Sequence, residues 1–247
     1  MALPADTGPG RGGAPIPRPL LYGRRRGRSL RPGQRCALAA LRPRLAFDLP
    51  AAAALDPAAL FPRTPRAVCL EIGFGGGEHL AALAECFPQT GFIGCEVYEN
   101  GIAKLLGEVA RRHLENVRLF LDDARLLIAA LAPASIACGV ILFPDPWPKA
   151  RHKKRRIVSS ETLDGLARIM TDGAELRLAT DDPDYFAAML ELVTAHPDFE
   201  WLARCSADWR VRPADWPPTR YEEKARAAGR ISGYLRARRR PRRSPTG

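Results

Sequence analysis

The sequence predicts an α/β domain in which a mostly parallel central sheet of about seven strands carries helices on both faces. From Arg66 onward, short apolar segments alternate with helical patterns, an alternation typical of a parallel sheet with crossover helices. The segment ACGVILF (137–143) is apolar throughout, as expected of a strand buried on both faces. The length of 247 residues favours one domain with its own core over two.

The alternating elements follow one another in a regular order. We expect strands at 67–73, 90–97, 117–123, 137–146 and 174–181, and helices at 78–86, 100–113, 124–131, 160–170 and 184–196. Two later segments, 200–205 and 231–239, could add antiparallel edge strands, with a loop rich in Pro and Trp at 209–218 between them.

Positive charge is concentrated in three stretches of the chain. The net charge is +11, and residues 1–35 contribute +7 while residues 236–247 contribute +6. A further +6 falls within 149–156. We expect residues 1–19 and 236–247 to be disordered tails around a single domain at 20–235. Clustered positive charge is typical of a protein that binds nucleic acid, and an anionic membrane surface is the weaker alternative.

Composition disfavours several classes of protein. The six cysteines form no C-x-x-C pair, so we expect reduced thiols in a cytoplasmic protein. The four histidines show no ligand spacing, so we expect no metal site. No segment has the apolar length of a signal peptide or a membrane span, so we expect no membrane partner. The oligomeric state, monomer or homodimer, stays open.

A glycine-rich turn, EIGFGGGE (71–78), joins the first predicted strand to its helix. Its glycines, Gly73 and Gly75 among them, would let a ligand approach the backbone closely. Glu96 ends the next strand, at the spacing where a carboxylate accepts both hydroxyls of a nucleoside ribose. The turn and the acid together predict a nucleoside cofactor. The carboxylates of Glu71 and Glu78 beside the glycines favour the sulfonium cofactor S-adenosylmethionine over the pyrophosphate of NAD.

The third predicted strand ends in two acids, Asp122 and Asp123. Either could accept the adenine amino group of such a cofactor. Asp123 also precedes the helix expected at 124–131, where it would serve equally well as an N-cap. The sequence leaves these alternatives open.

The stretch FPDPWPKARHKKRR (143–156) places a carboxylate, an aromatic ring and a run of cations at the end of the fourth strand. Ligands of open α/β sheets bind at the carboxyl ends of the strands, so we expect Asp145 and Trp147 to emerge at the site. Three prolines would stiffen the backbone that presents them. The cations that follow indicate an active-site edge that faces a polyanion.

Six motifs give the chain a family resemblance. They are YGRRRGRSLRPGQ (22–34), LEIGFGGGEHL (70–80), GCEVYENGI (94–102), the stretch at 143–156, LRLATDDPDYF (176–186) and TRYEEKARAAGRISGYL (219–235). Together they resemble the bacterial tRNA (guanine-N7)-methyltransferase family. The resemblance implies a Rossmann-like class I methyltransferase fold, S-adenosylmethionine as cofactor and tRNA as partner. It also implies methylation of guanine N7 in the tRNA variable loop, usually at position 46, to give 7-methylguanosine.

The resemblance further implies roles for individual residues. The positions that match cofactor-binding residues, together with the glycines of the turn, are Glu71, Gly73, Gly75, Glu96, Asp123 and Asp145. Asp145 also matches the proposed catalytic aspartate. The positions that match substrate-contacting residues are Lys149, Asp181, Thr219, Arg220, Tyr221 and Glu222. The positions that match an RNA-contacting loop are Arg151, His152, Lys153, Lys154, Arg155 and Arg156.

Three other functions compete with this one. The D-P-W-P sequence at 145–148 resembles the signature of methyltransferases that act on exocyclic amino groups. The basic loop at 149–156 and the TRYE block at 219–222 argue against such an enzyme. The glycine turn and Glu96 alone would also suit a nicotinamide-dependent dehydrogenase. A non-catalytic RNA-binding module would use the cationic tails but would not need the cofactor acids.

Overall fold

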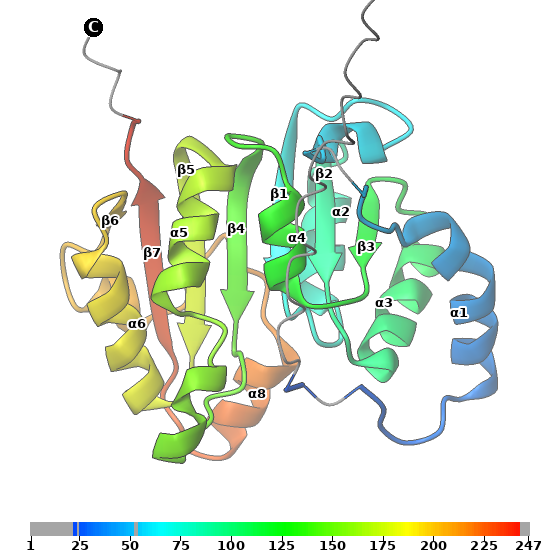
Figure 1. Cartoon of the computed structure of the whole chain (residues 1–247). Coiled ribbons are helices and arrows are strands. Elements are labelled where there is room, and N and C mark those ends of the chain that lie inside the picture. The colour runs from blue at the N-terminus through cyan, green and yellow to red at the C-terminus, as the bar shows by residue number, and fades with distance from the viewer. Residues whose placement is uncertain (1–21, 24, 52–53, 243–247) are drawn as a thin grey trace, which may run out of the picture.

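The computed structural model describes residues 22–23, 25–51 and 54–242, and within them seven strands form a single sheet (Figure 1). The strands are β1 (Ala67–Ile72), β2 (Thr90–Cys95), β3 (Val117–Phe120), β4 (Ile136–Leu142), β5 (Met170–Thr180), β6 (Phe199–Trp201) and β7 (Gly233–Arg239). Their order is β3-β2-β1-β4-β5-β7-β6. Neighbours from β3 to β5 are parallel, whereas β7 is antiparallel to both β5 and β6. The predicted α/β fold class is confirmed.

Helices connect these strands. Those in the described part of the chain are α1 (Pro32–Leu45), α2 (Glu78–Cys86), α3 (Glu99–Arg112), α4 (Ala124–Ala130), α5 (Ser160–Ile169), α6 (Pro183–Ala195), α7 (Ala207–Arg210) and α8 (Arg220–Ala227), with the short 3-10 helices η1 (Pro57–Leu60) and η2 (Ala150–Arg155). None of these helices combines the length and the apolarity that crossing a membrane requires.

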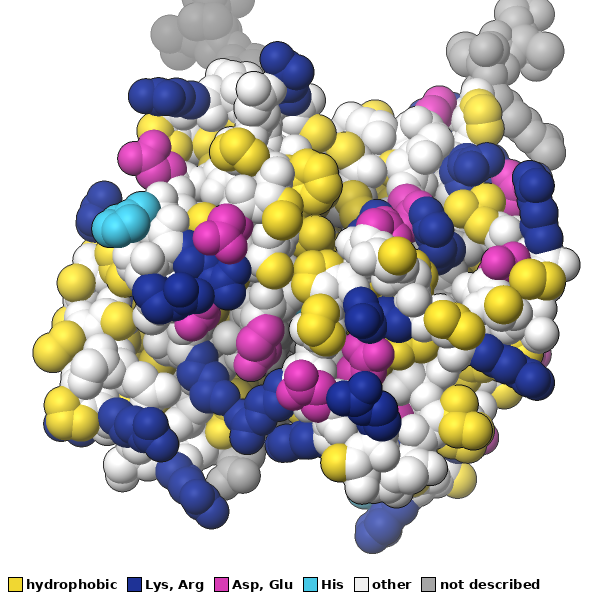
Figure 2. Space-filling view, turned by 180° about the vertical axis from the view of Figure 1, so that it is seen from behind, with side chains coloured by type: hydrophobic (Ala, Val, Ile, Leu, Met, Phe, Trp, Pro, Cys, Tyr) yellow, Lys and Arg dark blue, Asp and Glu magenta, His cyan; other side chains and the backbone are white. Residues whose placement is uncertain are grey.

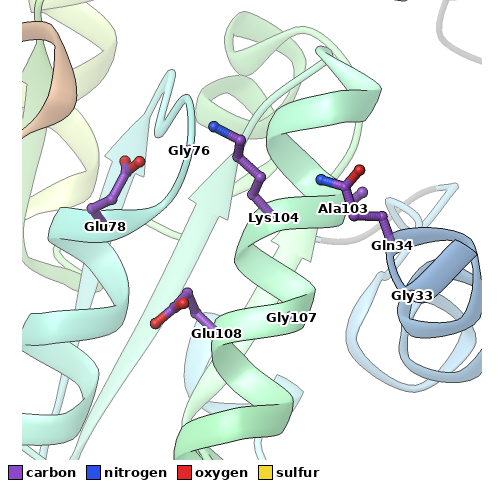
Figure 3. A pocket seen from close by; sticks show the side chains of 8 residues that line it. All are labelled: Gly33, Gln34, Gly76, Glu78, Ala103, Lys104, Gly107 and Glu108. Atoms are coloured by element: carbon purple, nitrogen blue, oxygen red, sulfur yellow. The ribbon is translucent and has the colours of Figure 1, made fainter. Parts of the chain in front are cut away.

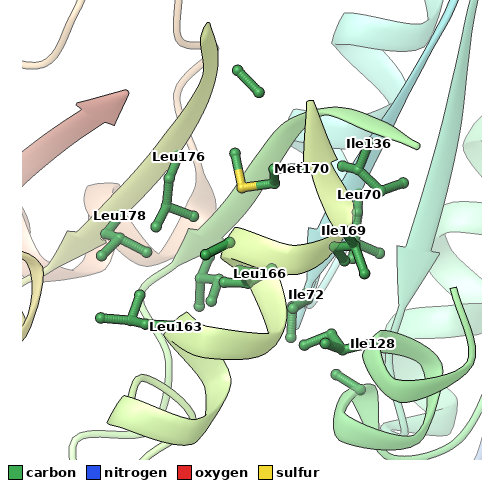
Figure 4. Packing of buried hydrophobic residues seen from close by; sticks show 14 of the residues in the cluster. Leu70, Ile72, Ile128, Ile136, Leu163, Leu166, Ile169, Met170, Leu176 and Leu178 are labelled. Atoms are coloured by element: carbon green, nitrogen blue, oxygen red, sulfur yellow. The ribbon is translucent and has the colours of Figure 1, made fainter. Parts of the chain in front are cut away.

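The helices cover both faces of the sheet. On one face α4, α5 and α6 pack on β1, β4 and β5, and the side chains of Leu70, Leu163 and Leu176 lie in this largest apolar cluster (Figure 4). On the other face α1, α2 and α3 cover β1 to β3. Beyond them, Trp216 and Tyr234 cover β4 and β5. Strands β1, β2 and β4 are therefore largely buried on both faces, which explains their nearly continuous apolar sequences.

The elements predicted between 67 and 196 are confirmed, with small shifts at their ends. Helix α1 was not predicted, because only Leu45 among its residues is buried and its apolar stripe is therefore weak. Helix α8 was not predicted either. It begins at the TRYE block, where Thr219 caps it by accepting from the Glu222 amide.

The predicted start of a disordered tail at residue 236 is wrong, because β7 continues to Arg239. The alternation of the strand buries Leu235 and Ala237. Arg239 is itself 5% exposed and forms ion pairs with Asp172 and Asp198. Arginines that suggest a free cationic tail thus hold the last strand in the sheet. The predicted tail at 1–19 lies outside the described residues.

Candidate active site

A large cleft opens at the carboxyl ends of β1 to β4, at the point where the strand order reverses between β1 and β4. Its volume is about 1420 Å³. A small-molecule site usually occupies roughly 300–1,000 Å³, so the cleft has room for a cofactor and part of a second substrate. The predicted site residues that line it are Gly73, Gly75, Glu96, Asp122, Asp123, Asp145, Lys153, Lys154, Arg155, Arg156 and Tyr221.

The glycine turn forms one wall of this cleft. Gly73 and Gly75 have φ of 73° and 56°, in the left-handed region that favours glycine. A Cβ placed on Gly75 would lie 2.6 Å from the Tyr221 ring, so the ring of α8 rests directly on the turn. Both the backbone conformation and the close approach therefore require glycine at this position.

We expect Gly75→Ala to weaken binding of S-adenosylhomocysteine, because the new methyl group must push away Tyr221 and also strain the turn. Calorimetric titration would measure the loss, which we place at tenfold or about 1.4 kcal/mol at least. The matched control is Gly173→Ala, since Gly173 has φ of 80° but no atom near its added Cβ and lies in β5 outside the cleft. Equal affinity in the two variants would contradict a cofactor role for the turn.

Glu96 connects the glycine turn to the end of β2. Its Oε2 accepts from the Gly75 amide at 2.9 Å, and its Oε1 accepts from the amides of Val97 and Tyr98 at 2.7 and 3.0 Å. Burial raises the pKa of Glu96, and the negative charge of Asp145 adds to the rise, while the three amide hydrogen bonds oppose it. The carboxylate is therefore held in one orientation at the cleft wall, close enough to Asp145 to sense its charge.

The two acids after β3 have different surroundings. Asp123 caps α4 by accepting from the Arg125 amide, and both of its carboxylate oxygens also accept from the Arg125 guanidinium, at 2.9 and 2.6 Å. The N-cap prediction for Asp123 is confirmed. Asp122 accepts from the Asp123 amide through Oδ1 and lies 3.7 Å from Arg25. Both acids line the cleft, so both can reach a ligand there.

Glu71 does not line the cleft. It is 6% exposed, and its Oε2 lies 2.8 Å from Nδ1 of His79 in the first turn of α2. The sequence gives no sign of this pairing, because Glu71 lies on β1 and His79 on α2. In the described residues, no group of three or more His, Cys, Asp or Glu side chains is arranged to hold a metal ion.

The loop after β4 presents Asp145 as an exposed side chain at the cleft. Two non-glycine residues of this loop, Phe143 and Trp147, have positive φ values of 50° and 45°. Such a conformation costs energy and persists only where its surroundings enforce it. The Trp147 ring packs edge-on against His152, and the Arg155 guanidinium lies over it at 4.9 Å from the centroid. These contacts hold the Trp147 ring against the cations that follow it.

The basic loop that follows is only partly available to a partner. Lys149, Arg151 and Lys154 are exposed. Arg155, by contrast, lies between the rings of Trp147 and Tyr22, which are 4.9 and 4.6 Å from its guanidinium. The other cations of the loop, Lys153 and Arg156, form ion pairs with Asp184 of α6.

The remaining predicted substrate residues lie at the same edge of the sheet. Asp181 follows β5, and Arg220, Tyr221 and Glu222 begin α8, which lies below the carboxyl ends of the strands in Figure 1. Asp181 accepts from Arg230 at 2.6 Å. Glu222 accepts from Tyr234 at 2.8 Å and from Arg212 at 3.1 Å. Only Tyr221 of this group reaches the cleft itself, and burial, followed by the charge of Glu96, raises its pKa.

The surface seen from behind carries many Lys and Arg side chains across its lower part, with Asp and Glu side chains between them (Figure 2).

A second hollow of about 300 Å³ lies between α1, α3 and the outer side of the glycine turn (Figure 3). Lys104 extends from α3 toward the turn, and Glu78 and Glu108 flank the opening. This hollow contains none of the predicted site residues, so the carboxyl-edge cleft is the candidate active site.

Comparison with known proteins identifies the family. A family model described as "Putative methyltransferase" matches residues 65–232. The tRNA (guanine-N(7)-)-methyltransferase of Paramagnetospirillum magneticum is 50% identical over 94% of this chain and 97% of its own length. That of Azorhizobium caulinodans is 51% identical over 87% of this chain and 92% of its own. The chain belongs to the tRNA (guanine-N7)-methyltransferase family. The family resemblance of its sequence motifs is thereby confirmed.

Solved structures agree with the fold of this methyltransferase family member. The crystal structure of a mutant 16S rRNA (adenine(1408)-N(1))-methyltransferase from Catenulisporales acidiphilia is similar with a TM-score of 0.50, over 73% of this chain and 88% of that chain. The identity is 15%, so the likeness concerns the fold alone. The class I methyltransferase fold predicted from the sequence is therefore supported independently of sequence similarity.

Proposed function

We propose that this protein transfers a methyl group from S-adenosylmethionine to N7 of guanosine 46 in the variable loop of tRNA, in the cytoplasm. One observation carries the proposal beyond family membership. The cleft that holds Glu96 and the glycine turn also holds Asp145 on the adjoining loop, and exposed cations border it. The proposed cofactor site, the Asp145 carboxylate and the cations that would face RNA therefore lie around one cleft.

The residues of the cleft fit the cofactor. Glu96 is fixed by three amides and lies at the cleft wall, where its remaining acceptor capacity suits ribose hydroxyls. The absence of a side chain at Gly75 lets the Tyr221 ring pack on the turn at the cleft wall. Asp122 or Asp123 would accept the adenine amino group. When bound, S-adenosylmethionine supplies a methyl group activated by a sulfonium charge.

Guanine N7 carries an in-plane lone pair and no proton, so its methylation requires no general base at the nucleophile. The contribution of the protein is then orientation and charge. Methylation leaves a cationic purine, and the carboxylate of Asp145 would hold the guanine edge and stabilise the developing charge. Exposure of Asp145 at the cleft allows this contact without rearrangement of the loop.

Selection of guanine would fall to Asp181 and Glu222. Two carboxylates can accept from N1–H and the exocyclic amine, a combination of donors that adenine lacks. Both carboxylates are held by cations, Asp181 by Arg230 and Glu222 by Arg212. Because Arg230 is itself 53% exposed, it can move aside when a base enters.

The exposed cations of the basic loop would contact RNA phosphates. Replacing Arg151 and Lys154 by Gln should weaken tRNA binding and flatten its salt dependence, by about 0.7–0.9 in log–log slope per lost contact. Affinity for S-adenosylhomocysteine should not change. The control replaces Arg63 and Arg66, two exposed arginines that precede β1 at the opposite edge of the sheet. A loop variant with the salt slope of this control would make the loop an ordinary solvated surface.

The alternative of exocyclic amino methylation is weaker. The relatives that are 50% and 51% identical are named for methylation of guanine N7. The proposed site of modification is tested by transfer of labelled methyl groups to an unmodified tRNA transcript and to the same transcript with adenosine at position 46. The proposal predicts labelling of the first and none of the second. Equal labelling of both would contradict the assignment of position 46.

A further inference from the structure

Arg156 belongs to the basic loop but is buried, unlike the other cations around it. Its side chain is 6% exposed, whereas that of its ion-pair partner Asp184 is 56% exposed. Arg156 Nε donates to the Pro146 carbonyl at 2.8 Å, and Nη2 donates to Asp184 Oδ2 at 2.6 Å. The guanidinium also lies over the Tyr185 ring, 4.4 Å from its centroid. These contacts occupy Nε and Nη2, and little of the side chain remains accessible to a phosphate.

Through these contacts the loop after β4, which carries Asp145, is bound to α6. Pro146 follows Asp145 directly, so its carbonyl is part of the backbone that aims the carboxylate. The Tyr185 ring under the Arg156 guanidinium is held in place, because Tyr185 is completely buried and its hydroxyl accepts from the Val158 amide at 3.1 Å. Asp184 lies in the first turn of α6, where a negative charge is favourable. The loop thus has an anchor of fixed geometry on the neighbouring helix.

The loop needs such an anchor. Positive φ at Phe143 and Trp147 is unfavourable for bulky residues, so the loop would relax if its contacts were lost. Asp184 receives a second hydrogen bond, from Lys153 Nζ to Oδ1 at 2.9 Å. The hydrogen bond from Lys153, followed by that from Arg156, lowers the pKa of Asp184, so this carboxyl remains ionised at neutral pH.

We propose that Arg156 and Asp184 are a positioning pair that holds Asp145 in its productive orientation through the Pro146 carbonyl, and that Arg156 does not contact RNA. The inference rests on the proposed function, since it assigns Asp145 to catalysis. It separates the basic loop into two parts. Exposed cations such as Arg151 and Lys154 would bind the polyanion, while Arg156 shapes the active site.

The test compares Arg156→Gln, Asp184→Asn and the double variant in steady-state methylation of tRNA. Misplacement of a reacting group by about 1 Å can cost a hundred-fold in rate, so we expect Arg156→Gln to lower kcat by about 10- to 100-fold. Asp184→Asn should lower kcat several-fold. The KM for tRNA and the salt dependence of binding should stay at wild-type values. Because the residues act as one unit, the double variant should be no slower than Arg156→Gln alone.

Two controls make the outcome specific. Asp164→Asn removes another exposed carboxylate of an ion pair, with His196, and should leave kcat unchanged. Lys154→Gln should raise KM and flatten the salt slope. If Arg156→Gln fails to fold, as thermal unfolding would show, Asp184→Asn carries the test, since its side chain is largely exposed.

The inference is overturned if Arg156→Gln behaves like Lys154→Gln, if kcat is unchanged in both Arg156→Gln and Asp184→Asn, or if their effects simply add. The wild-type protein is measured in the same assay. Absence of 7-methylguanosine with the wild-type protein would refute the proposed function, whereas normal product formation with unaffected variants would refute only the positioning pair.

Discussion

Replacing Asp145 by Ala is expected to lower kcat about a hundred-fold or more while leaving the Kd for S-adenosylhomocysteine within a few-fold of the wild-type value. The reason is that Asp145 would act on the charge that develops on guanine, and loss of one preorganised electrostatic group typically costs this much. Single-turnover methylation of tRNA measures the rate, and calorimetric titration measures the affinity.

The control for this variant is Asp215→Ala, which removes an exposed carboxylate paired with Arg177 and outside the cleft. It should retain wild-type turnover. Near-normal turnover in Asp145→Ala would remove the proposed catalytic role. A loss of cofactor affinity as large as the loss of rate would make Asp145 a cofactor ligand instead.

Replacing Glu96 by Ala should have the opposite pattern. Loss of charged hydrogen bonds to ribose is expected to weaken cofactor binding by about 1.5–3 kcal/mol, a roughly 10- to 150-fold rise in Kd. The glycine turn should loosen as well, because the Gly75 amide loses its acceptor. An unchanged Kd for S-adenosylhomocysteine would contradict the placement of the cofactor in this cleft.

The pH dependence of binding offers an independent check on Glu96. Burial raises its pKa, so on acidification the carboxylate becomes neutral at a higher pH than an exposed glutamate would. Cofactor affinity should therefore fall as the pH drops through this raised value. Glu96→Gln cannot titrate and should bind weakly with little pH dependence. Parallel pH profiles for the wild type and Glu96→Gln would assign the pH effect to another group.

Much of the fold follows from periodicity in the sequence. Strands such as 137–143 are apolar throughout because both of their faces are covered, and this pattern needs no tertiary information. The acids at the carboxyl ends of successive strands could be grouped for the same reason, since parallel strands end at a common edge. Glu96, Asp123 and Asp145 do line one cleft.

What the sequence could not predict depends on contacts between distant segments. A run of cations carries no mark that distinguishes the exposed Arg151 from the buried Arg156, whose partner lies 28 residues away on α6. The arginines after 235 suggested a free tail because their partners Glu175, Asp172 and Asp198 are also remote. Likewise, the pairing of Glu71 with His79 becomes visible only when α2 is packed on β1.

The position of β7 also changes how the chain should be shortened in experiments. Removing residues 236–247 as a supposed tail would delete most of a strand that pairs with both β5 and β6. Such a truncation should lower the thermal unfolding temperature or prevent folding, because the buried Ala237 would be removed and Leu235 would lose neighbours in the core. Full-length protein is the appropriate material for tRNA-binding measurements.

The central claim, transfer of a methyl group to N7 of guanine in tRNA, is tested most directly by product analysis. The pure protein is incubated with labelled S-adenosylmethionine and unmodified tRNA, and the tRNA is then digested to nucleosides and separated. The account predicts that the label elutes as 7-methylguanosine. Label in a nucleoside methylated on an exocyclic nitrogen, or no labelled nucleoside at all, would contradict it.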